Sequence, residues 1–515
     1  MFDLQHFHLH RRHFGLASSA LALALALTGC AAVGPNFVKP TPAAPDDWTS
    51  WRSGDASLRV PAEASQALTA QWWKAFNDAT LDALEQRAFD ASPDLQTAAL
   101  RFAQARAQRS TVAAQRGPEV NASGSATRQR QSESGASTRM IGIMGADPRL
   151  TELLAEPFTL YQAGFDASWE LDLWGRVRRS VEAADADVGQ QAALLDLARL
   201  SLASDVARNY FELRTAQRQI RLMREDIAAL EDRAALLQAR VEGGVLDHTD
   251  LQRQRAELAA LKAQLPPLLA QEAASANQIA LLLGERPGAL QAELVPRDAD
   301  ARTTLPDLAL GLPSEVALRR PDIRAAEARL HNATANIGIA KANLYPSIRL
   351  GAKFGFESYL SGEFSDWGSR TWSVGPSLNL PIFDHGRRTA TVQLRELQQQ
   401  EAAVNYQKTV LKAWQEIDDA LSAYSAEQQQ AHELQARSDA ASDAYQLAQA
   451  RYDGGATDYT AVLDSQRSYL QARRDLAANQ GRLAARFITV NKALGNGSGS
   501  EQLPSPSVPP TSSAR

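Results

Sequence analysis

Apolar and polar residues alternate along several segments of the chain. In residues 161–173 the odd positions carry mostly apolar side chains and the even positions mostly polar ones. The same alternation runs through residues 348–356 and 372–382, and more weakly through residues 120–126. A period of two is typical of β-strands with one apolar and one polar face. These segments therefore predict four amphipathic strands.

Much longer stretches follow a helical period. Through residues 206–241 apolar residues recur in alternating steps of four and three, and a second seam with smaller side chains runs through residues 417–452. This heptad spacing predicts helices that supercoil left-handedly. A helix over residues 176–241 would be roughly 100 Å long. Two shorter helices, over residues 93–116 and 250–283, would together nearly match that length.

The chain contains an internal duplication. The motif Ala-Arg-Val-Glu-Gly-Gly at residues 239–244 recurs as Ala-Arg-Tyr-Asp-Gly-Gly at residues 450–455. The Leu-Gly pair at residues 283–284 recurs at residues 494–495 with the same spacing, which a chance similarity of composition does not explain. Each copy is predicted to contain a helix, two strands, a long helix and a returning helix.

These patterns, with the composition between them, divide the chain. Residues 35–45 are rich in proline and predict an extended segment. The C-terminal residues hold Gly, Ser and Pro without periodicity, which is typical of disorder. The predicted segments are a signal peptide at 1–29, a lipidated extended segment at 30–70, a first repeat at 71–285, an equatorial linker at 286–312, a second repeat at 313–495 and a disordered tail at 496–515.

The N-terminus has the pattern of an export signal. Arg11 and Arg12 precede a short apolar stretch that ends in Leu-Thr-Gly-Cys at residues 27–30. This ending resembles the bacterial lipobox, which implies cleavage before Cys30 and acylation of its thiol. The alternative is an ordinary signal peptide followed by a chance cysteine. By resemblance to other lipoproteins, the absence of aspartate after Cys30 implies the outer membrane rather than retention at the inner membrane.

Composition and motifs bear on the class of function. The net charge of -5 over 515 residues gives no indication of nucleic-acid binding. The sequence contains no phosphate loop, no Gly-x-Ser-x-Gly, no His-Glu-x-x-His and no zinc-spaced cluster. We therefore expect no enzyme, no metal site and no cofactor apart from the lipid on Cys30. A periplasmic adaptor built on coiled coils is a second possibility, but two helical hairpins with four long amphipathic strands argue against it.

The strands favour a membrane-spanning barrel. Strands of about ten residues with one apolar face suit a transmembrane β-barrel. A soluble hairpin with one face packed on a core is the alternative. Only a closed barrel satisfies the backbone groups of strands in lipid, and four strands are too few to close, since such barrels begin at about eight. The sequence therefore predicts a barrel shared between chains.

Three motifs now suggest a family. Trp-Trp-Lys-Ala-Phe at residues 72–76, Pro-Asp-Leu at 93–95 and Trp-Glu-Leu-Asp-Leu-Trp-Gly-Arg at 169–176 resemble those of the outer-membrane efflux factors. These are the TolC-like proteins, and the OprM/NodT-type lipoprotein branch is the most similar. The resemblance implies a fold of mixed α and transmembrane β structure: a homotrimer whose 12-stranded β-barrel continues as a long coiled α-barrel across the periplasm.

The resemblance also implies a function and partners. Such a channel is anchored in the cell outer membrane, with its helical part in the periplasm. It passively conducts small molecules, such as drugs or other toxic compounds, out of the cell. The implied partners are a periplasmic adaptor (membrane fusion) protein and an inner-membrane pump, usually of the resistance-nodulation-division (RND) class, which together form a tripartite efflux system.

The same resemblance implies a periplasmic gate at the helix turns. Thr249-Asp250 and Asp464 match positions where the family closes its periplasmic end with aspartates, and Tyr452 matches a tyrosine in contacts between hairpins. Solvated first-turn carboxylates, favoured by the helix dipole, are the alternative for both aspartates. The predicted turns themselves are the glycine pairs Gly243, Gly244, Gly454 and Gly455.

Two further aspartates near these turns have a simpler interpretation. Asp247 and Asp458 occupy the same position in the two copies, three residues after the second glycine. Aspartate is strongly preferred at helix N-caps, where its side chain accepts a hydrogen bond from a backbone N–H. We therefore expect Asp247 and Asp458 to be caps rather than gate residues.

Overall fold

The protein is described here by a computed structural model. The structure describes residues 32–42, 44–48, 51–59, 71–135, 139, 143, 148–244, 247–295, 308, 310 and 313–497. The predicted signal peptide at 1–29, Cys30, nearly all of the tail at 496–515 and about half of the linker at 286–312 lie outside these residues. The predictions for those parts therefore remain predictions.

The described residues form two compact units. The sheet unit draws on Met1–Val38, Arg106–Asp187 and Leu330–Ala402. The helical unit draws on Lys39–Ala105, Val188–Arg329 and Ala403–Arg515. Each unit therefore combines segments from both copies of the duplication.

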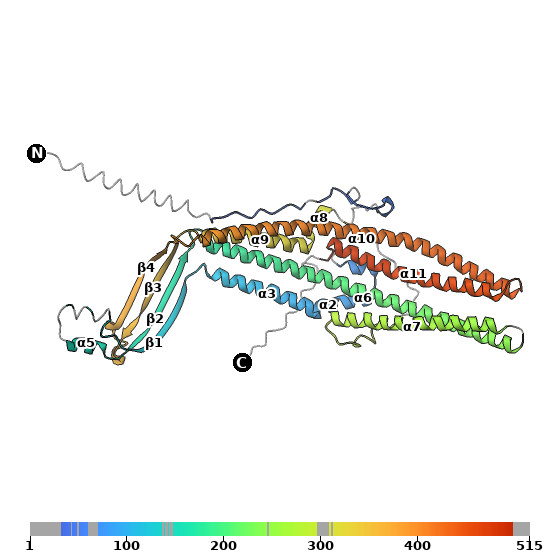
Figure 1. Ribbon diagram of the computed structural model, residues 1–515, viewed down its shortest axis with the longest axis horizontal. Coiled ribbons are helices and arrows are strands. Elements are labelled where there is room, and N and C mark those ends of the chain that lie inside the picture. The colour runs from blue at the N-terminus through green and yellow to red at the C-terminus, as the bar shows by residue number, and fades with distance from the viewer. Residues whose placement is uncertain are drawn as a thin grey trace. The chain divides into compact units, whose positions relative to one another are not determined.

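The order of elements is the one that the sequence predicts, and it occurs twice (Figure 1). The first copy consists of α3 (Pro93–Ala114), β1 (Glu119–Gln129), β2 (Phe158–Leu171), α6 (Arg176–Glu242) and α7 (His248–Leu282). The second consists of α9 (Pro321–Ala342), β3 (Ser347–Ser358), β4 (Arg370–Asn379), α10 (Arg387–Asp453) and α11 (Tyr459–Leu494). Shorter helices lie before α3 and α9, namely η1 (Ala56–Leu58), η2 (Trp72–Phe76), α2 (Ala79–Ala91) and α8 (Pro313–Arg319).

The four strands form one antiparallel sheet in the order β1-β2-β3-β4. Pairing of β2 with β3 joins the two copies. Phe165 lies opposite Phe354, which lies opposite Trp372, so one face carries a row of exposed aromatic side chains. The neighbouring pair Asp166 and Lys353 lies on the other face, because successive side chains of a strand point to opposite sides. The predicted amphipathic alternation is thus present in three dimensions.

Two local features differ from the sequence-based expectation. Strand β4 ends at Asn379 although the alternation continues to Ile382, because Pro381 has no backbone N–H to donate to a strand ladder. The connection between β1 and β2 contains a helix, α5 (Pro148–Ala155), that the alternation did not reveal. Helix α7 contains Pro266 and Pro267 in its interior.

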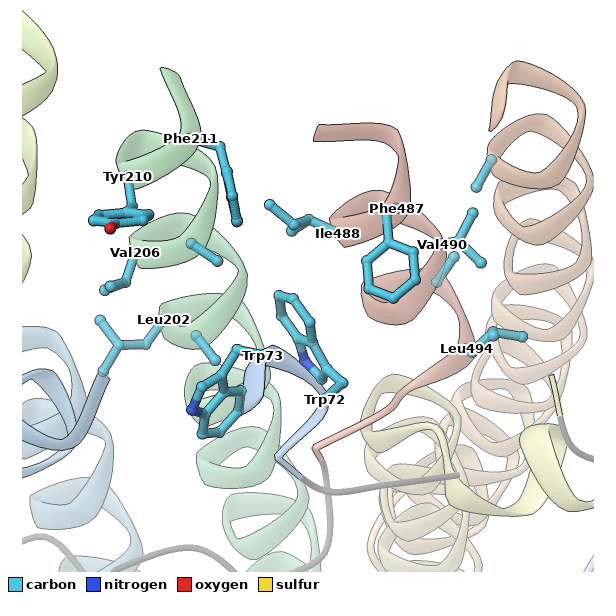
Figure 2. Packing of buried hydrophobic residues seen from close by; sticks show 14 of the residues in the cluster. Trp72, Trp73, Leu202, Val206, Tyr210, Phe211, Phe487, Ile488, Val490 and Leu494 are labelled. Carbon is cyan, nitrogen blue, oxygen red and sulfur yellow. The ribbon is translucent and has the colours of Figure 1, made fainter. Parts of the chain in front are cut away.

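The core of the helical unit is aromatic and aliphatic. Figure 2 shows Trp72 and Trp73 of η2 in one cluster with side chains of α6 and α11. Phe76 packs against Phe211 of α6 and Phe487 of α11, with ring centroids 4.5 and 5.2 Å apart. The Trp-Trp-Lys-Ala-Phe motif therefore forms part of the packing between these helices.

The seam predicted for the first long helix is buried. Val206, Tyr210, Leu213, Ile220 and Leu230 all lie in the interior. Burial of such an apolar seam, rather than intrinsic propensity, supplies most of the stability of long helices in proteins. Among the described residues, no helix is both long enough and apolar enough to cross a membrane.

Candidate functional site at the hairpin tips

Each long helix ends in a glycine turn. Helix α6 is followed by Gly243 and Gly244, and α10 by Gly454 and Gly455. The second glycine of each pair has a positive φ, 70° at Gly244 and 72° at Gly455. Left-handed backbone of this kind is favourable for glycine and closes many helix C-termini. In the structure these glycines lie between the paired helices.

The returning helices begin at aspartate caps. The Asp247 carboxylate accepts a hydrogen bond from the backbone N–H of Thr249 at 3.1 Å. The Asp458 carboxylate accepts one from the N–H of Ala461, also at 3.1 Å. Both aspartates are therefore N-caps, as the sequence predicts, and Thr249 contributes its backbone N–H to the first of them.

The two candidate gate carboxylates each lie near an arginine of their own helix. Oδ1 of Asp250, in the first turn of α7, lies 3.7 Å from Nη1 of Arg253, and the Asp250 side chain is 25% exposed. Oδ1 of Asp464, on α11, lies 3.8 Å from Nη1 of Arg467, and the Asp464 side chain is 69% exposed. Paired charges three residues apart on a helix attract weakly in water. The role of these aspartates in a pore ring stays a prediction.

An apolar cluster joins the two hairpins beneath the turns. Leu237 and Leu251 of the first hairpin are buried in one cluster with Tyr459, Val462 and Leu463 of the second. The partly buried ring of Tyr452 packs against this cluster, 5.3 Å from the ring of Tyr459. Burial of these side chains stabilises contact between the tips through the hydrophobic effect.

Tyrosines also bridge the hairpins through polar bonds. Arg240 of α6 donates from Nη1 to Oη of Tyr452 at 3.2 Å, so Tyr452 does contact the other hairpin. Tyr459 donates its hydroxyl to Oε1 of Gln254 on α7 at 3.2 Å. Gln254 is itself buried and donates to the carbonyl oxygen of Leu230. Burial raises the pKa of Tyr459 to about 12, so its hydroxyl remains protonated at neutral pH.

Two arginines complete the links between the hairpins. Arg253 of α7 donates from Nη1 to Oγ1 of Thr460 on α11 at 3.1 Å. Arg467 of α11 donates from Nη2 to Oε2 of Glu257 on α7 at 2.7 Å, and this bond raises the pKa of Arg467. Neither pair was predicted from the sequence. The sequence feature that could have indicated the ion pair is a pair of opposite charges, Glu257 in the first copy of the duplication and Arg467 in the second.

The contacts between hairpins are therefore of two kinds, one apolar and one polar. The apolar cluster resists separation in water, whereas the hydrogen bonds and the ion pair fix how the helices align. We name the four polar links the tip latch; it consists of Arg240–Tyr452, Gln254–Tyr459, Arg253–Thr460 and Glu257–Arg467. In the part of the chain that the structure describes, no group of three or more His, Cys, Asp or Glu side chains is arranged to hold a metal ion.

Comparison with known proteins identifies the family to which the chain is similar. The model of the outer membrane efflux protein family matches residues 84–285 and 312–496. OprJ, an outer membrane protein of Pseudomonas aeruginosa, is 33% identical over 483 residues, covering 93% of this chain and 95% of OprJ. The probable outer membrane lipoprotein SilC of Salmonella typhimurium is 28% identical, covering 94% of this chain and 99% of SilC.

Solved structures agree with this assignment. The outer membrane channel CmeC of Campylobacter jejuni superposes with a TM-score of 0.80 and 25% identity, covering 91% of this chain and 95% of CmeC. The fold is therefore that of TolC-like outer membrane channels, mostly helical with a small sheet. Because the family model matches a stretch in each copy of the duplication, the chain belongs to the outer membrane efflux protein family, and it is an outer-membrane efflux channel component rather than an enzyme.

Proposed function

We propose that three copies of the chain form a 12-stranded transmembrane β-barrel that continues as a coiled α-barrel. In this arrangement small molecules, such as drugs or other toxic compounds, pass passively from a periplasmic adaptor and an inner-membrane pump to the outside. One observation carries the proposal: the sheet is amphipathic and β1 and β4 lie at its edges. In lipid such edges would leave backbone groups unpaired, so closure with further copies is required.

The duplication indicates how neighbouring copies meet. Ala186 and Ala193 of α6 are buried, whereas the equivalent residues of α10, Leu397 and Val404, are exposed. The carbonyl oxygen of Ala183 on the same face of α6 accepts a hydrogen bond from Asn332 of α9. A chain contains only two repeats, so no further repeat of the same chain is left to cover the face of α10 that carries Leu397 and Val404. We infer that α3 of the next chain takes this place, which gives a head-to-tail ring.

The number of copies, the anchor and the partners come from the family. Three chains of four strands give the 12 strands expected of the TolC-like channels. Acylation of Cys30 would anchor the chain, since several acyl chains on one residue hold a protein stably on a membrane. The adaptor is a membrane fusion protein, and the pump is of the RND class. Similar proteins are named for their export of different compounds, such as the toluene efflux pump protein TtgF of Pseudomonas putida.

The hairpin tips provide the periplasmic gate. The tip latch and the apolar cluster hold the two hairpins of one chain together. Threefold assembly would bring copies of Asp250 and Asp464 toward one axis, where like charges attract counter-cations. An adaptor that binds the tips would open the gate by separating these contacts.

Native mass spectrometry in mild detergent tests the assembly. We expect a trimer for the wild type and for Gln400→Glu, because Gln400 and its counterpart Gly189 are both exposed. Val404→Glu should yield mainly monomers, since it places a charge in the proposed interface. A dominant monomer or dimer in the wild type would contradict the trimer. The mass of the same sample tests the anchor: residues retained before Cys30, or an unmodified Cys30, would contradict acylation.

A further inference from the structure

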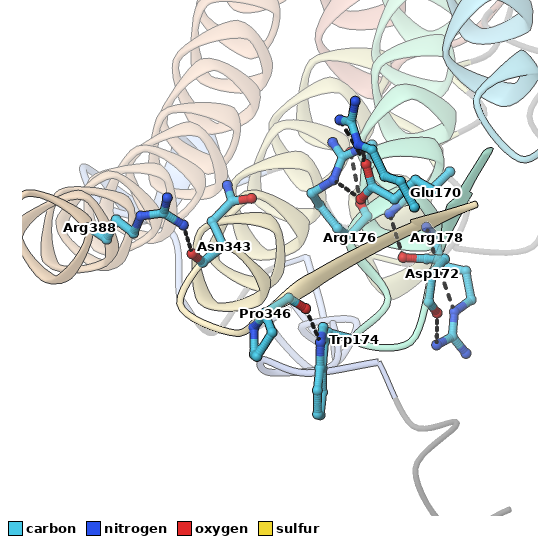
Figure 3. Close-up of polar contacts among 11 residues, drawn as sticks. Glu170, Asp172, Trp174, Arg176, Arg178, Asn343, Pro346 and Arg388 are labelled. Atoms are coloured by element: carbon cyan, nitrogen blue, oxygen red, sulfur yellow. Dashed lines mark hydrogen bonds and ion pairs between the residues drawn. The ribbon is translucent and has the colours of Figure 1, made fainter. Parts of the chain in front are cut away.

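The junction between β2 and α6 holds the start of the described chain. Trp174, in this junction, donates from its indole N–H to the carbonyl oxygen of Pro346 at 2.7 Å (Figure 3). Its ring stacks on Tyr345 with centroids 4.7 Å apart. The carbonyl oxygen of Trp174 accepts a hydrogen bond from the backbone N–H of Val33 at 3.0 Å. The N-terminal segment therefore bonds to the junction of β2 and α6 within the sheet unit.

Arg179 of α6 binds the same segment with several donors. Its Nε donates to the carbonyl oxygen of Val33 at 3.3 Å, and Nη2 donates to that of Gly34 at 3.4 Å and to Oδ1 of Asn36 at 2.7 Å. Nη1 pairs with Glu182 at 2.7 Å. The Arg179 side chain is only 5% exposed. A buried guanidinium without these acceptors would be costly, so the segment and Arg179 depend on each other.

Glycines allow the backbones to approach closely. Gly34 has φ +94°, and a Cβ added there would lie 2.6 Å from Cα of Gly338 on α9. A Cβ at Gly338 would lie 2.8 Å from Cγ and Cδ of Arg179. At the junction, a Cβ at Gly175 would lie 2.4 Å from Cβ of Ala32. A side chain at Gly34 or Gly175 would force the segment away from the helices, and one at Gly338 would displace Arg179.

The last contact of the segment is aromatic. The ring of Phe37 stacks on His331 of α9, with centroids 4.2 Å apart and an interplanar angle of 11°. His331 in turn bonds through Nε2 to Oε1 of Glu182 at 3.0 Å. Glu182 thus connects the two side chains, Arg179 and His331, that contact the segment directly.

The second copy lacks these features, although its backbone is equivalent. Gly386 corresponds to Gly175 and has a similar φ of +78°, but a Cβ there would meet nothing within 4 Å. The residues equivalent to Arg179 and Glu182 are Ala390 and Gln393. The contacts are therefore not a general consequence of the fold, because only one of two equivalent places has them.

We propose that α6 and α9 form a peptide-binding groove for the extended segment Ala32–Phe37, and that this groove fixes the mature N-terminus at the junction of β2 and α6. The ligand class is an extended peptide that offers two carbonyl oxygens, an asparagine amide oxygen and an aromatic ring. Insofar as it concerns the membrane anchor, the inference rests on the proposed acylation of Cys30. Cys30 lies three positions before Val33, and this stretch spans at most about 11 Å, so the lipid would enter the membrane beside this junction.

Hydrogen exchange of the full chain in detergent, read by mass spectrometry, tests the groove. We expect the peptide covering residues 32–37 to be protected in the wild type and to exchange roughly tenfold or more faster in Arg179→Ala, since hydrogen bonds to a charged group are lost. Gly34→Ala changes only the segment and should have the same effect. Arg176→Ala is the matched control, because Arg176 lies in the same turn of α6 and pairs with Glu170 (Figure 3).

A Cys30→Ser chain, exported with a non-lipoprotein signal peptide, separates the groove from the anchor. Protection of residues 32–37 in this chain would support the groove even if mass spectrometry shows that Cys30 carries no lipid. Loss of protection in Cys30→Ser alone would overturn the proposal, since the lipid and not the groove would then hold the segment. Unprotected residues 32–37 in the wild type, or full protection in both Arg179→Ala and Gly34→Ala, would overturn it as well.

Discussion

Arg467 of α11 holds Glu257 of α7 with two donors, Nε at 3.0 Å and Nη2 at 2.7 Å, and so links the tips of two helical hairpins that lie far apart in the sequence. The arginine is more than half exposed and the glutamate about a quarter exposed. An ion pair as exposed as this one stabilises the contact between its helices by about 0.2–1 kcal/mol. It is therefore suited to a contact that must form and break, rather than to one that holds the fold together.

Weakening the tip latch should favour the open state. The pair of changes Arg253→Ala and Arg467→Ala removes two of its four links. A loss of about 1 kcal/mol would raise the ratio of open to closed channel roughly fivefold, measured as resting conductance in planar bilayers. Glu231→Gln is the control, because Glu231 pairs with Lys262 within the first hairpin. Unchanged conductance in the double variant would show that the latch does not hold the gate.

The two candidate gate aspartates should set ion preference. Asp250→Ala with Asp464→Ala removes carboxylates near the tips, and we expect a smaller preference for cations and an altered resting conductance. Asp443→Ala, an exposed carboxylate of α10 away from the turns, should change neither property. If reversal potentials and conductance of the double variant both equal those of the wild type, these aspartates are only solvated helix-end residues.

Glu85 of α2 should make stability depend on pH. Its side chain is completely buried, and neither oxygen has a hydrogen-bond partner among the described residues. Burial, with smaller contributions from the charges of Asp82 and Asp205, raises its pKa well above the usual value. Because the folded-state pKa is above the unfolded one, the stability associated with the neutral form is complete below the unfolded pKa and is lost as pH rises through the folded pKa.

Glu85→Gln removes this ionisation while keeping size and shape. We expect the thermal unfolding midpoint of Glu85→Gln to exceed that of the wild type at neutral and alkaline pH, with the difference shrinking toward acidic pH. Each unit by which the pKa is raised corresponds to about 1.4 kcal/mol. Glu212→Gln, at an exposed position of α6, is the control. Parallel midpoints for Glu85→Gln and the wild type across the whole pH range would show that folding does not raise the pKa of Glu85.

The connection between β1 and β2 should be accessible from outside the cell. It is the longer of the two strand connections, and Ser134 lies in its exposed part. Loop tips of this kind tolerate insertions. An epitope inserted at Ser134 should be labelled on intact cells, and one inserted at Gly497, after α11, only once the outer membrane is permeabilised. The opposite pattern of labelling would reverse the proposed orientation.

Much of the candidate site follows from local sequence. Gly244 and Gly455 end helices because glycine accepts a positive φ, and Asp247 and Asp458 begin helices because their carboxylates reach a nearby backbone N–H. Strand faces follow from alternation in the same way, since Phe165 and Asp166 must point to opposite sides. Each of these features depends on residues close together in the chain, so sequence alone determines it.

Contacts between distant residues were decided only by tertiary structure. A heptad pattern shows which side of a helix is apolar, but it does not specify which helix packs there or at what height. The Glu257–Arg467 ion pair, the Gln254–Tyr459 bond and the position of Val33 against Arg179 all depend on that alignment. The sequence thus determined the two copies, their strands and their turns, whereas the packing of helices decided which side chains meet at the hairpin tips and beside the N-terminal segment.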